Sequence, residues 1–176
     1  MVLEIFSWAI IAYAFGFLPI AYALMGKGDA GTAFKTGLIP GLVTLIIAFI
    51  MYRDGLALGA AGATYVLGAT ILGIAGMTFT LVGIAGFYTV QAKTLSIVLV
   101  FAGLFLVIYG LWYMYQFMSV FSFLTLFLAV FLYGIACLGG GLPAFGMGAK
   151  AGGSLIALCS AINFILAISW QFGWIV

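Results

Sequence analysis

Long apolar runs, separated by short polar or glycine-rich stretches, follow one another along the whole 176-residue chain. A helix needs about 20 mostly apolar residues to cross a bilayer. Six runs suit that length, and none alternates with the period of a strand. The pattern predicts an all-α polytopic membrane protein with both termini outside and one transmembrane domain, 1–176. Its six helices are expected at about 5–25, 36–52, 56–77, 93–113, 117–138 and 149–170.

The third run carries a stripe of small residues and no charge. The stripe recurs at spacings of three and four, so it falls on one helix face. Small faces let membrane helices approach closely, so we expect this helix to pack between others, with the hydroxyl pair of Thr64 and Tyr65 inside it. The stripe consists of Gly55, Gly59, Gly62, Val66, Ala69, Gly73 and Gly76, and a second small face has Ala57, Ala61, Thr64 and Gly68.

Polar and glycine-rich stretches predict the connections. The stretch 26–35 reads as a loop, Arg53-Asp54-Gly55 as a tight turn, and 139–148 as a flexible loop without a phosphate-binding pattern. The stretch 78–92 is short for a span, so we expect a loop there, with a re-entrant segment or an extra helix left open. Pro19 is expected to kink the first helix.

Composition places the chain in the membrane. It is 68% hydrophobic and 5% charged, whereas about 25% of the residues in soluble domains are charged. The start of the chain lacks a basic region and carries Glu4, so we expect a first span rather than a cleaved signal. The expected location is the plasma (inner) membrane with lipid as a partner, and a net charge of +2 gives no reason to expect nucleic acid.

Basic residues predict the orientation. With six spans, the first, third and fifth connections share one side and hold Lys27, Lys35, Lys93 and Lys150, whereas the opposite side holds only Arg53. The positive-inside rule therefore places those three connections in the cytoplasm and both termini outside.

The chain lacks the residue types that catalysis or ion coupling usually requires inside a membrane. It has no histidine, and all eight charged residues fall in predicted loops or at span ends. Acid–base and nucleophilic catalysis need a base near the reacting group, and ion-coupled pumps keep a charge at depth. Cys137 and Cys159 lie in apolar surroundings and are expected to act as small hydrophobic residues. We therefore expect no enzyme, no metal and no cofactor.

Neutral polar and aromatic groups remain as candidates for a solute path. A small uncharged solute can exchange its water hydrogen bonds for those of such groups. The alternative is structural: serine and threonine bond to their own helix, and tyrosine and tryptophan mark the interface. Asn163 fits helix packing and a pore equally well. The candidates are Thr44, Thr64, Tyr65, Tyr109, Trp112, Ser160, Asn163 and Trp170, with Tyr13, Tyr22 and Thr70 as further neutral groups.

Two short stretches resemble the AmiS/UreI family of six-span proteins. Lys27-x-Asp29, followed by an apolar segment with Gly41-Leu42, resembles its first loop and second helix, and Gly62-x-Thr64-Tyr65 resembles a motif of its third helix. A tryptophan after the last span is also similar. The resemblance implies a passive channel for urea or short-chain amides in a homo-oligomeric ring, often a hexamer. The gating histidines and carboxylates of the acid-activated urea channel, and a glutamate in the last helix, have no counterpart here.

Two other functions stay open. Gly41, Tyr52-Arg53-x-Gly55 and Gly59 resemble the acetate/succinate transporter family, although its Asn-Pro-Ala-Pro-Leu-Gly signature is absent. An anion path would favour helix N-termini or a basic residue such as Lys35 or Arg53. The third hypothesis is an accessory subunit of a larger membrane complex, because the fourth and fifth helices carry bulky apolar side chains on all sides.

Overall fold

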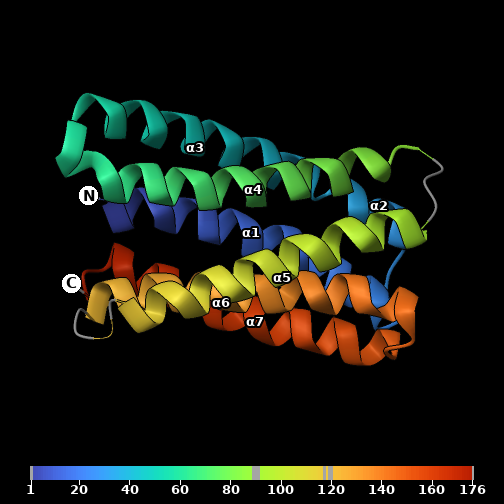
Figure 1. Cartoon of the computed structure of the whole chain (residues 1–176). Helices are drawn as coiled ribbons and strands as arrows, with labels where there is room; N and C mark the ends of the chain where they lie inside the picture. Colours follow the sequence, from blue (N-terminus) through green and yellow to red (C-terminus); the bar gives the residue numbers. More distant parts are fainter. Residues whose placement is uncertain (1, 89–91, 117, 119–120, 176) are drawn as a thin grey trace.

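Six long helices lie side by side in the computed structural model, joined by short connections at the two ends (Figure 1). The structure describes every residue except 1, 89–91, 117, 119–120 and 176. All six are long and apolar enough to cross a membrane, and no described residue lies in a strand, so the expected all-α bundle is confirmed. They are α1 (Val2–Leu24), α3 (Leu38–Ala57), α4 (Ala63–Ala85), α5 (Ala92–Gln116), α6 (Phe121–Gly141) and α7 (Ala149–Gln171).

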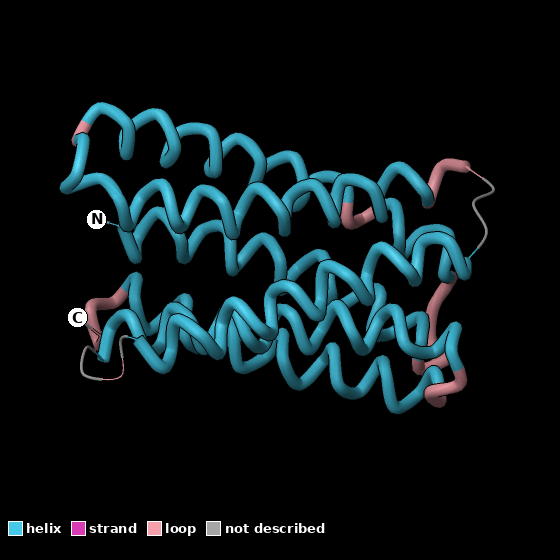
Figure 2. The backbone as a smooth tube through the Cα atoms, in the orientation of Figure 1, coloured by secondary structure: helices cyan, strands magenta, loops and turns pink. Residues whose placement is uncertain are grey.

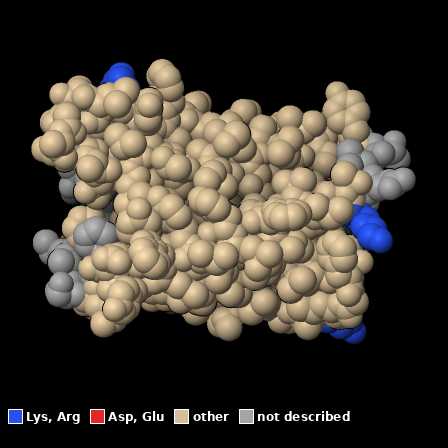
Figure 3. Space-filling model, in the orientation of Figure 1, with Lys and Arg blue, Asp and Glu red and all other residues tan. Residues whose placement is uncertain are grey.

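The two ends of the bundle differ in charge. Both termini and the α3–α4 and α5–α6 connections lie at one end, here called the terminal end, and the other three connections lie at the opposite end (Figures 1 and 2). That opposite end holds Lys27, Lys35, Lys93 and Lys150 and is called the lysine end. Figure 3 shows Lys and Arg side chains near the ends of the visible face and none across its middle. The chain is an integral membrane protein, and the side on which its lysine end lies stays a prediction.

A seam of small residues holds α3 against α4. On one side they recur every seven residues at Gly62, which directly precedes α4, and at Ala69, Gly76 and Gly83 within it; on α3 they are Gly41, Ala48 and Gly55. A Cβ added at Gly76 would lie 3.0 Å from the Leu45 backbone nitrogen, and one at Gly41 would lie 2.5 Å from that of Thr80. The two backbones are therefore in direct contact, as small faces permit in membrane helices.

A second seam joins α5 to α6 in the same way. Ser96, Gly103 and Gly110 recur every seven residues on α5 and lie against Gly141, Gly134 and Phe131 of α6, respectively. A Cβ at Gly103 would lie 2.9 Å from the Gly134 carbonyl oxygen, and one at Gly141 would lie 2.8 Å from that of Ser96. Two tightly closed hairpins therefore flank the rest of the bundle.

The first helix lies between the hairpins and lines the centre. It packs most extensively on α7 and also contacts α3. The spans of α1, α4 and α6 are more deeply buried than those of α3, α5 and α7, so the former three line the axis and the latter three lie outside. Pro19 lies within α1, which continues on both sides of it.

The third membrane helix begins and ends later than predicted. Arg53, Asp54 and Gly55 do not form a turn but lie in the last turn and a half of α3, which ends at Ala57. The chain reverses after it, over Leu58 and the 3-10 turn η1 (Gly59–Gly62). Gly59 has φ +58, a conformation that glycine adopts without strain, so the reversal falls there. Gly55 and Gly59 therefore do not belong to the small stripe of α4.

The prediction that a loop begins at residue 78 was also wrong, because α4 continues to Ala85. The Thr78 hydroxyl donates to the Ile74 carbonyl at 2.8 Å within the helix, and Phe79 and Val82 are buried. A threonine that bonds to its own helix does not interrupt it in an apolar setting. A loop, a re-entrant segment and an extra helix were the alternatives for 78–92. Residues 89–91 of that stretch lie outside the described residues.

The first and fifth connections contain more helix than predicted. Residues 30–35 form the short helix α2 (Ala30–Lys35), whose first turn is capped because Asp29 Oδ2 accepts from the Thr32 backbone N–H at 2.6 Å. In the expected loop 139–148, the first three glycines complete α6 and the next four residues form the 3-10 turn η2 (Leu142–Phe145). The fifth membrane helix, α6, is described from Phe121, and its predicted start at 117 lies outside the described residues.

Candidate functional site

A layer of neutral polar side chains lies near the middle of the bundle. Tyr13, Thr44, Tyr133, Ser160 and Asn163 come from α1, α3, α6 and α7, and each lies within about one turn of the midpoint of its membrane span. All five are at most 4% exposed. We call them the mid-depth layer. They place hydrogen-bonding groups where a bilayer supplies none.

Most of this layer lacks hydrogen-bond partners. The hydroxyls of Tyr13, Tyr133 and Ser160 have none, and neither does Asn163 Oδ1, although Asn163 Nδ2 donates to the Ala129 carbonyl at 3.3 Å. Thr44 is satisfied by donating to the Pro40 carbonyl at 2.8 Å. A buried polar group without a partner costs about 1–3 kcal/mol. Four such groups at one depth are the chemical signature of a place that a polar molecule can occupy.

Three helices bring hydroxyls together at the centre. The polar neighbours of the Tyr13 hydroxyl are Thr44 of α3 and Tyr133 and Cys137 of α6. None of these approaches has the geometry of a hydrogen bond to Tyr13, whose hydroxyl remains unpaired. The cluster therefore has donors and acceptors to spare and no charged member.

Four aromatic rings close the axis at the same depth. Tyr13, Phe17, Phe79 and Tyr133, here called the aromatic tetrad, are all buried. Ring centroids are 4.4 Å apart for Tyr13 and Tyr133, 4.5 Å for Phe17 and Phe79, and 5.1 Å for Phe17 and Tyr133. The Phe79 ring lies against the backbone of α1 at Gly16, where an added Cβ would come within 2.7 Å of it. The tetrad fills the space between α1, α4 and α6.

A cavity opens above the tetrad at the lysine end. It has a volume of about 230 Å³, and we call it the vestibule. Every long helix except α3 and α7 contributes to its wall, together with α2 and the turn η2. Its lining residues are Leu24, Phe34, Ala85, Leu95, Ser96, Leu99, Gly140, Pro143 and Ala144.

A much smaller cavity lies on the other side of the tetrad. It offers about 10 Å³ for the centre of a water molecule and is lined by apolar atoms, including ring carbons of Tyr13 and Tyr133. This is the lower limit for holding one water, and without polar partners such a space stays dry. Vestibule, tetrad and small cavity follow in the same order along α1 (Leu24, Tyr13, Phe6), α4 (Ala85, Phe79, Leu72) and α6 (Gly140, Tyr133, Val130).

The residues selected from the sequence fall into three places. Thr44, Ser160 and Asn163 belong to the mid-depth layer. Thr64 and Tyr65 are half-buried in the first turn of α4 at the terminal end, where Tyr65 lines a shallow depression beside Asp54. The Gly-x-Thr-Tyr motif therefore lies at a membrane interface rather than inside the bundle.

The remaining three predicted residues lie away from the axis. Trp170 is buried, and its Nε1 donates to Thr125 Oγ1 of α6 at 3.2 Å, so it joins α7 to α6. Tyr109 is half-buried on α5 and packs on Tyr113, with ring centroids 4.6 Å apart. Trp112 is 61% exposed on the outer surface and does not line a path inside this bundle.

Sequence reasoning missed Tyr133, Phe79 and Cys137. A signal existed for Tyr133, because tyrosine in membrane helices favours the interface and this one lies in the middle of an apolar run. Phe79 fell in the segment expected to be a loop. Cys137 resembles any other small apolar residue, and only the fold places it beside two tyrosines.

Comparison with family models, with curated proteins and with solved structures returns no match to this chain. The function is therefore inferred mainly from the geometry of the bundle. The described residues contain no group of three His, Cys, Asp or Glu side chains that could hold a metal ion. Hydrogen bonding by neutral groups is the chemistry that the mid-depth layer has to offer.

Proposed function

We propose that this chain is a passive membrane channel for small uncharged polar solutes such as urea or short-chain amides. The observation that carries the proposal is the set of unpaired hydroxyls at mid-depth, beneath a vestibule and behind a closed ring of aromatic side chains. The short motifs that resemble the AmiS/UreI family support the same solute class.

The layer matches the needs of a neutral solute. A urea or amide molecule gives up hydrogen bonds to water when it enters the bundle, and the unpaired groups of Tyr13 and Tyr133 can replace them. An ion would find no opposite charge at this depth, where a buried charge is costly. The described lining of the vestibule and of the small cavity has no charged group, so we expect the solute to move only down its own gradient.

The axis is closed in this structure, so transport requires the tetrad to part. Phe79 is the side chain best placed to move, because its ring rests in the space left by Gly16 and touches three other rings. Aromatic side chains change rotamer without movement of the backbone. The path lies within one chain, so each copy in a ring oligomer would carry its own path.

Stopped-flow measurements on proteoliposomes test this proposal. Urea, acetamide and acetate are compared at two pH values, and we expect rapid urea or acetamide flux without saturation. Phe79→Leu, which removes the ring but keeps an apolar side chain, should raise the flux. Phe101→Leu on the lipid-facing side of α5 is the matched control, because Phe101 is 70% exposed. Flux of acetate alone would move the protein to the carboxylate transporters, and no flux of any solute would favour an accessory subunit.

The native cysteine beside the tetrad gives a second, independent readout. In a Cys159→Ala background, Cys137 is the remaining thiol, and it is fully buried. We expect N-ethylmaleimide to react slowly with Cys137 in the closed bundle and faster in the Phe79→Leu variant. Equal rates in the two proteins would show that removal of the Phe79 ring does not open the axis at this depth.

A further inference from the structure

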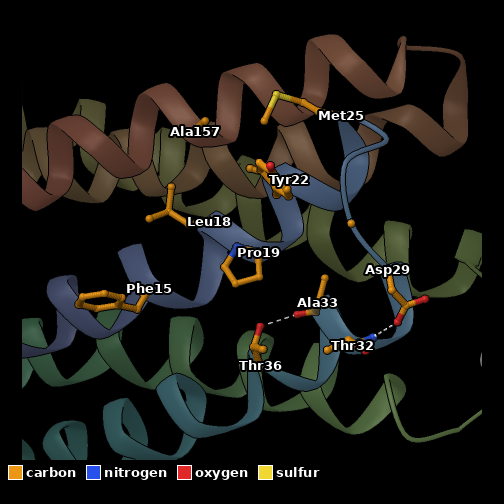
Figure 4. Close-up of a pocket in the computed structure, with 12 residues that line it drawn as sticks. Phe15, Leu18, Pro19, Tyr22, Met25, Asp29, Thr32, Ala33, Thr36 and Ala157 are labelled. Carbon is orange, nitrogen blue, oxygen red and sulfur yellow. Dashed lines mark hydrogen bonds between the residues drawn. The ribbon is translucent and has the colours of Figure 1, made fainter.

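A long groove on the outside of the bundle has no role in the solute path. It has a volume of about 560 Å³ and lies between α1, α2 and α7. Figure 4 shows Phe15, Leu18, Pro19 and Tyr22 of α1, and Met25 just after it, along one side, with Ala33 and Thr36 opposite. Phe15, Leu18 and Tyr22 are all exposed, so the groove opens to the surroundings of the bundle.

The groove changes character from one end to the other. Its mid-membrane part is apolar and is lined by Phe15, Leu18, Pro19 and Ala157. Its lysine-end part is polar and includes Gly28, Asp29 and Thr32 (Figure 4). A ligand that fills it must therefore be apolar toward the membrane centre and polar at the interface.

The length of the groove matches one leaflet. From Phe15 to Met25, just after the end of α1, the chain advances by ten residues, or about 15 Å at about 1.5 Å per residue. The hydrocarbon core of a bilayer is about 30 Å thick, so the groove extends from the midplane to one interface. This is the dimension and the direction of a lipid acyl chain in the lysine-end leaflet.

Both signs of charge stand at the interfacial end. The Asp29 carboxylate lines the groove and is exposed; its Oδ2 accepts from the Thr32 backbone N–H, and Lys35 also attracts it electrostatically. Two residues earlier, the Lys27 ammonium lies 5.9 Å from the centre of the Tyr22 ring, and Tyr22 lines the same groove. A headgroup that carries a phosphate and a primary ammonium complements this pair, because each of its charges finds the opposite one.

We propose that the groove binds an aminophospholipid of the phosphatidylethanolamine type. One acyl chain lies along Phe15, Leu18 and Pro19, the phosphate faces Lys27, and the ammonium donates to Asp29. Phosphatidylcholine lacks the N–H donors for Asp29, and phosphatidylglycerol lacks the cation, so both bind less tightly. The site is separate from the axial path and does not depend on the proposed solute.

Native mass spectrometry of the full chain, released from detergent with each of the three lipids, tests the assignment. We expect one tightly bound phosphatidylethanolamine per chain. Lys27→Gln and Asp29→Asn should each reduce its occupancy about fivefold, the usual effect of one charge at a membrane surface. Asn caps helices as well as Asp does, so Asp29→Asn removes the charge and keeps the start of α2. Lys150→Gln, at the same end but outside the groove, should leave the occupancy unchanged.

A variant that fills the groove tests the position of the acyl chain. Ala157→Phe places a ring in the groove and should displace the lipid, whereas Ala161→Phe, on an exposed part of α7 outside it, should not. Equal binding of the three lipids, or binding unaffected by all of the groove variants, would overturn the proposal. A second copy of the chain in place of lipid would appear as a dimer that Ala157→Phe dissociates. Solute flux is not measured in either experiment, so failure here leaves the channel proposal standing.

Discussion

The hairpin seams and the aromatic tetrad are built on opposite principles. In the α3–α4 and α5–α6 seams, glycines bring backbone against backbone, as at Gly103 and Gly134. At the axis, four large rings keep α1, α4 and α6 apart. In the seams the closest approaches include backbone atoms, which no side-chain rotation can move, whereas the contacts of the tetrad are between side-chain rings. The contrast separates a rigid frame from a centre that can change by rotamer alone.

The unpaired polar groups follow this contrast in part. On α4, the hydroxyls of Thr78 and Thr70 are satisfied within their own helix by donating to Ile74 and Val66, whereas the buried Thr80 hydroxyl at the α3–α4 seam has no hydrogen-bond partner. The hydroxyls of the tetrad tyrosines are also unpaired, and they belong to side chains that lie next to one another at the axis. Neighbouring unpaired groups on side chains that can move are what a solute path requires, and the closely packed hairpins keep that centre in place.

The largest expected effect comes from placing a side chain in a seam. Gly62→Ala should lower the free energy of unfolding by about 1–3 kcal/mol, the range for overpacking, because the new Cβ would collide with the Gly55 carbonyl oxygen. Gly73→Ala, within α4, has open space around its Cβ position and should change stability by about 1 kcal/mol or less. Unfolding in mixed micelles, followed by tryptophan fluorescence, compares the two. Equal losses would remove the distinction between seam and surface.

The next effect separates stability from transport. Tyr133→Phe deletes an unpaired buried hydroxyl and keeps the ring, so it should raise the free energy of unfolding by about 1 kcal/mol. The same variant should lower urea or acetamide flux, since a hydrogen-bonding group is lost from the path. Tyr88→Phe, exposed at the lysine end, is the control for both measurements. A stability loss in Tyr133→Phe would mean that its hydroxyl has a partner in the membrane.

A smaller effect tests whether the polar face of α7 belongs to the frame or to the path. Trp170→Phe removes the hydrogen bond to Thr125 and should cost about 1 kcal/mol, as interhelical hydrogen bonds in membranes do. Because Trp170 lies away from the tetrad, flux corrected for protein amount should not change. A change in flux as large as that of Tyr133→Phe would extend the path along α7 from Ser160 and Asn163 to Trp170.

The smallest effect concerns the cap of α2. The hydrogen bond from the Thr32 backbone N–H lowers the pKa of Asp29 below its ordinary value. A lowered pKa means that the folded state favours the carboxylate, so its contribution to stability is present above the ordinary pKa near 3.8 and is lost as the pH falls through the folded value. Asp29→Asn should remove this dependence below about pH 4 while keeping the cap. Amide exchange of residues 30–35 against pH measures it, and an unchanged profile would contradict the assignment.

Much of the helical frame could be predicted from the sequence. Only part of the mid-depth layer could. The number of spans and the small faces of α4 follow from local pattern, and depth along a span brought Thr44, Ser160 and Asn163 into consideration. The exact helix ends did not follow, because Gly55 and Thr78 look like helix ends in isolation. Gly55 packs against the start of α4, and the Thr78 hydroxyl bonds to its own helix, so neither residue ends a helix here.

The sequence by itself determined that the chain crosses the membrane six times, with its charges at the ends and neutral polar groups at depth. These properties depend on composition and on position along each run. Only the tertiary structure decided which face of each helix meets the axis, and so placed Tyr133 and Phe79 in the centre and Trp112 on the outside. The physical reason is that lipid and protein interior are equally apolar, so a membrane helix shows no polar stripe that reveals its buried face.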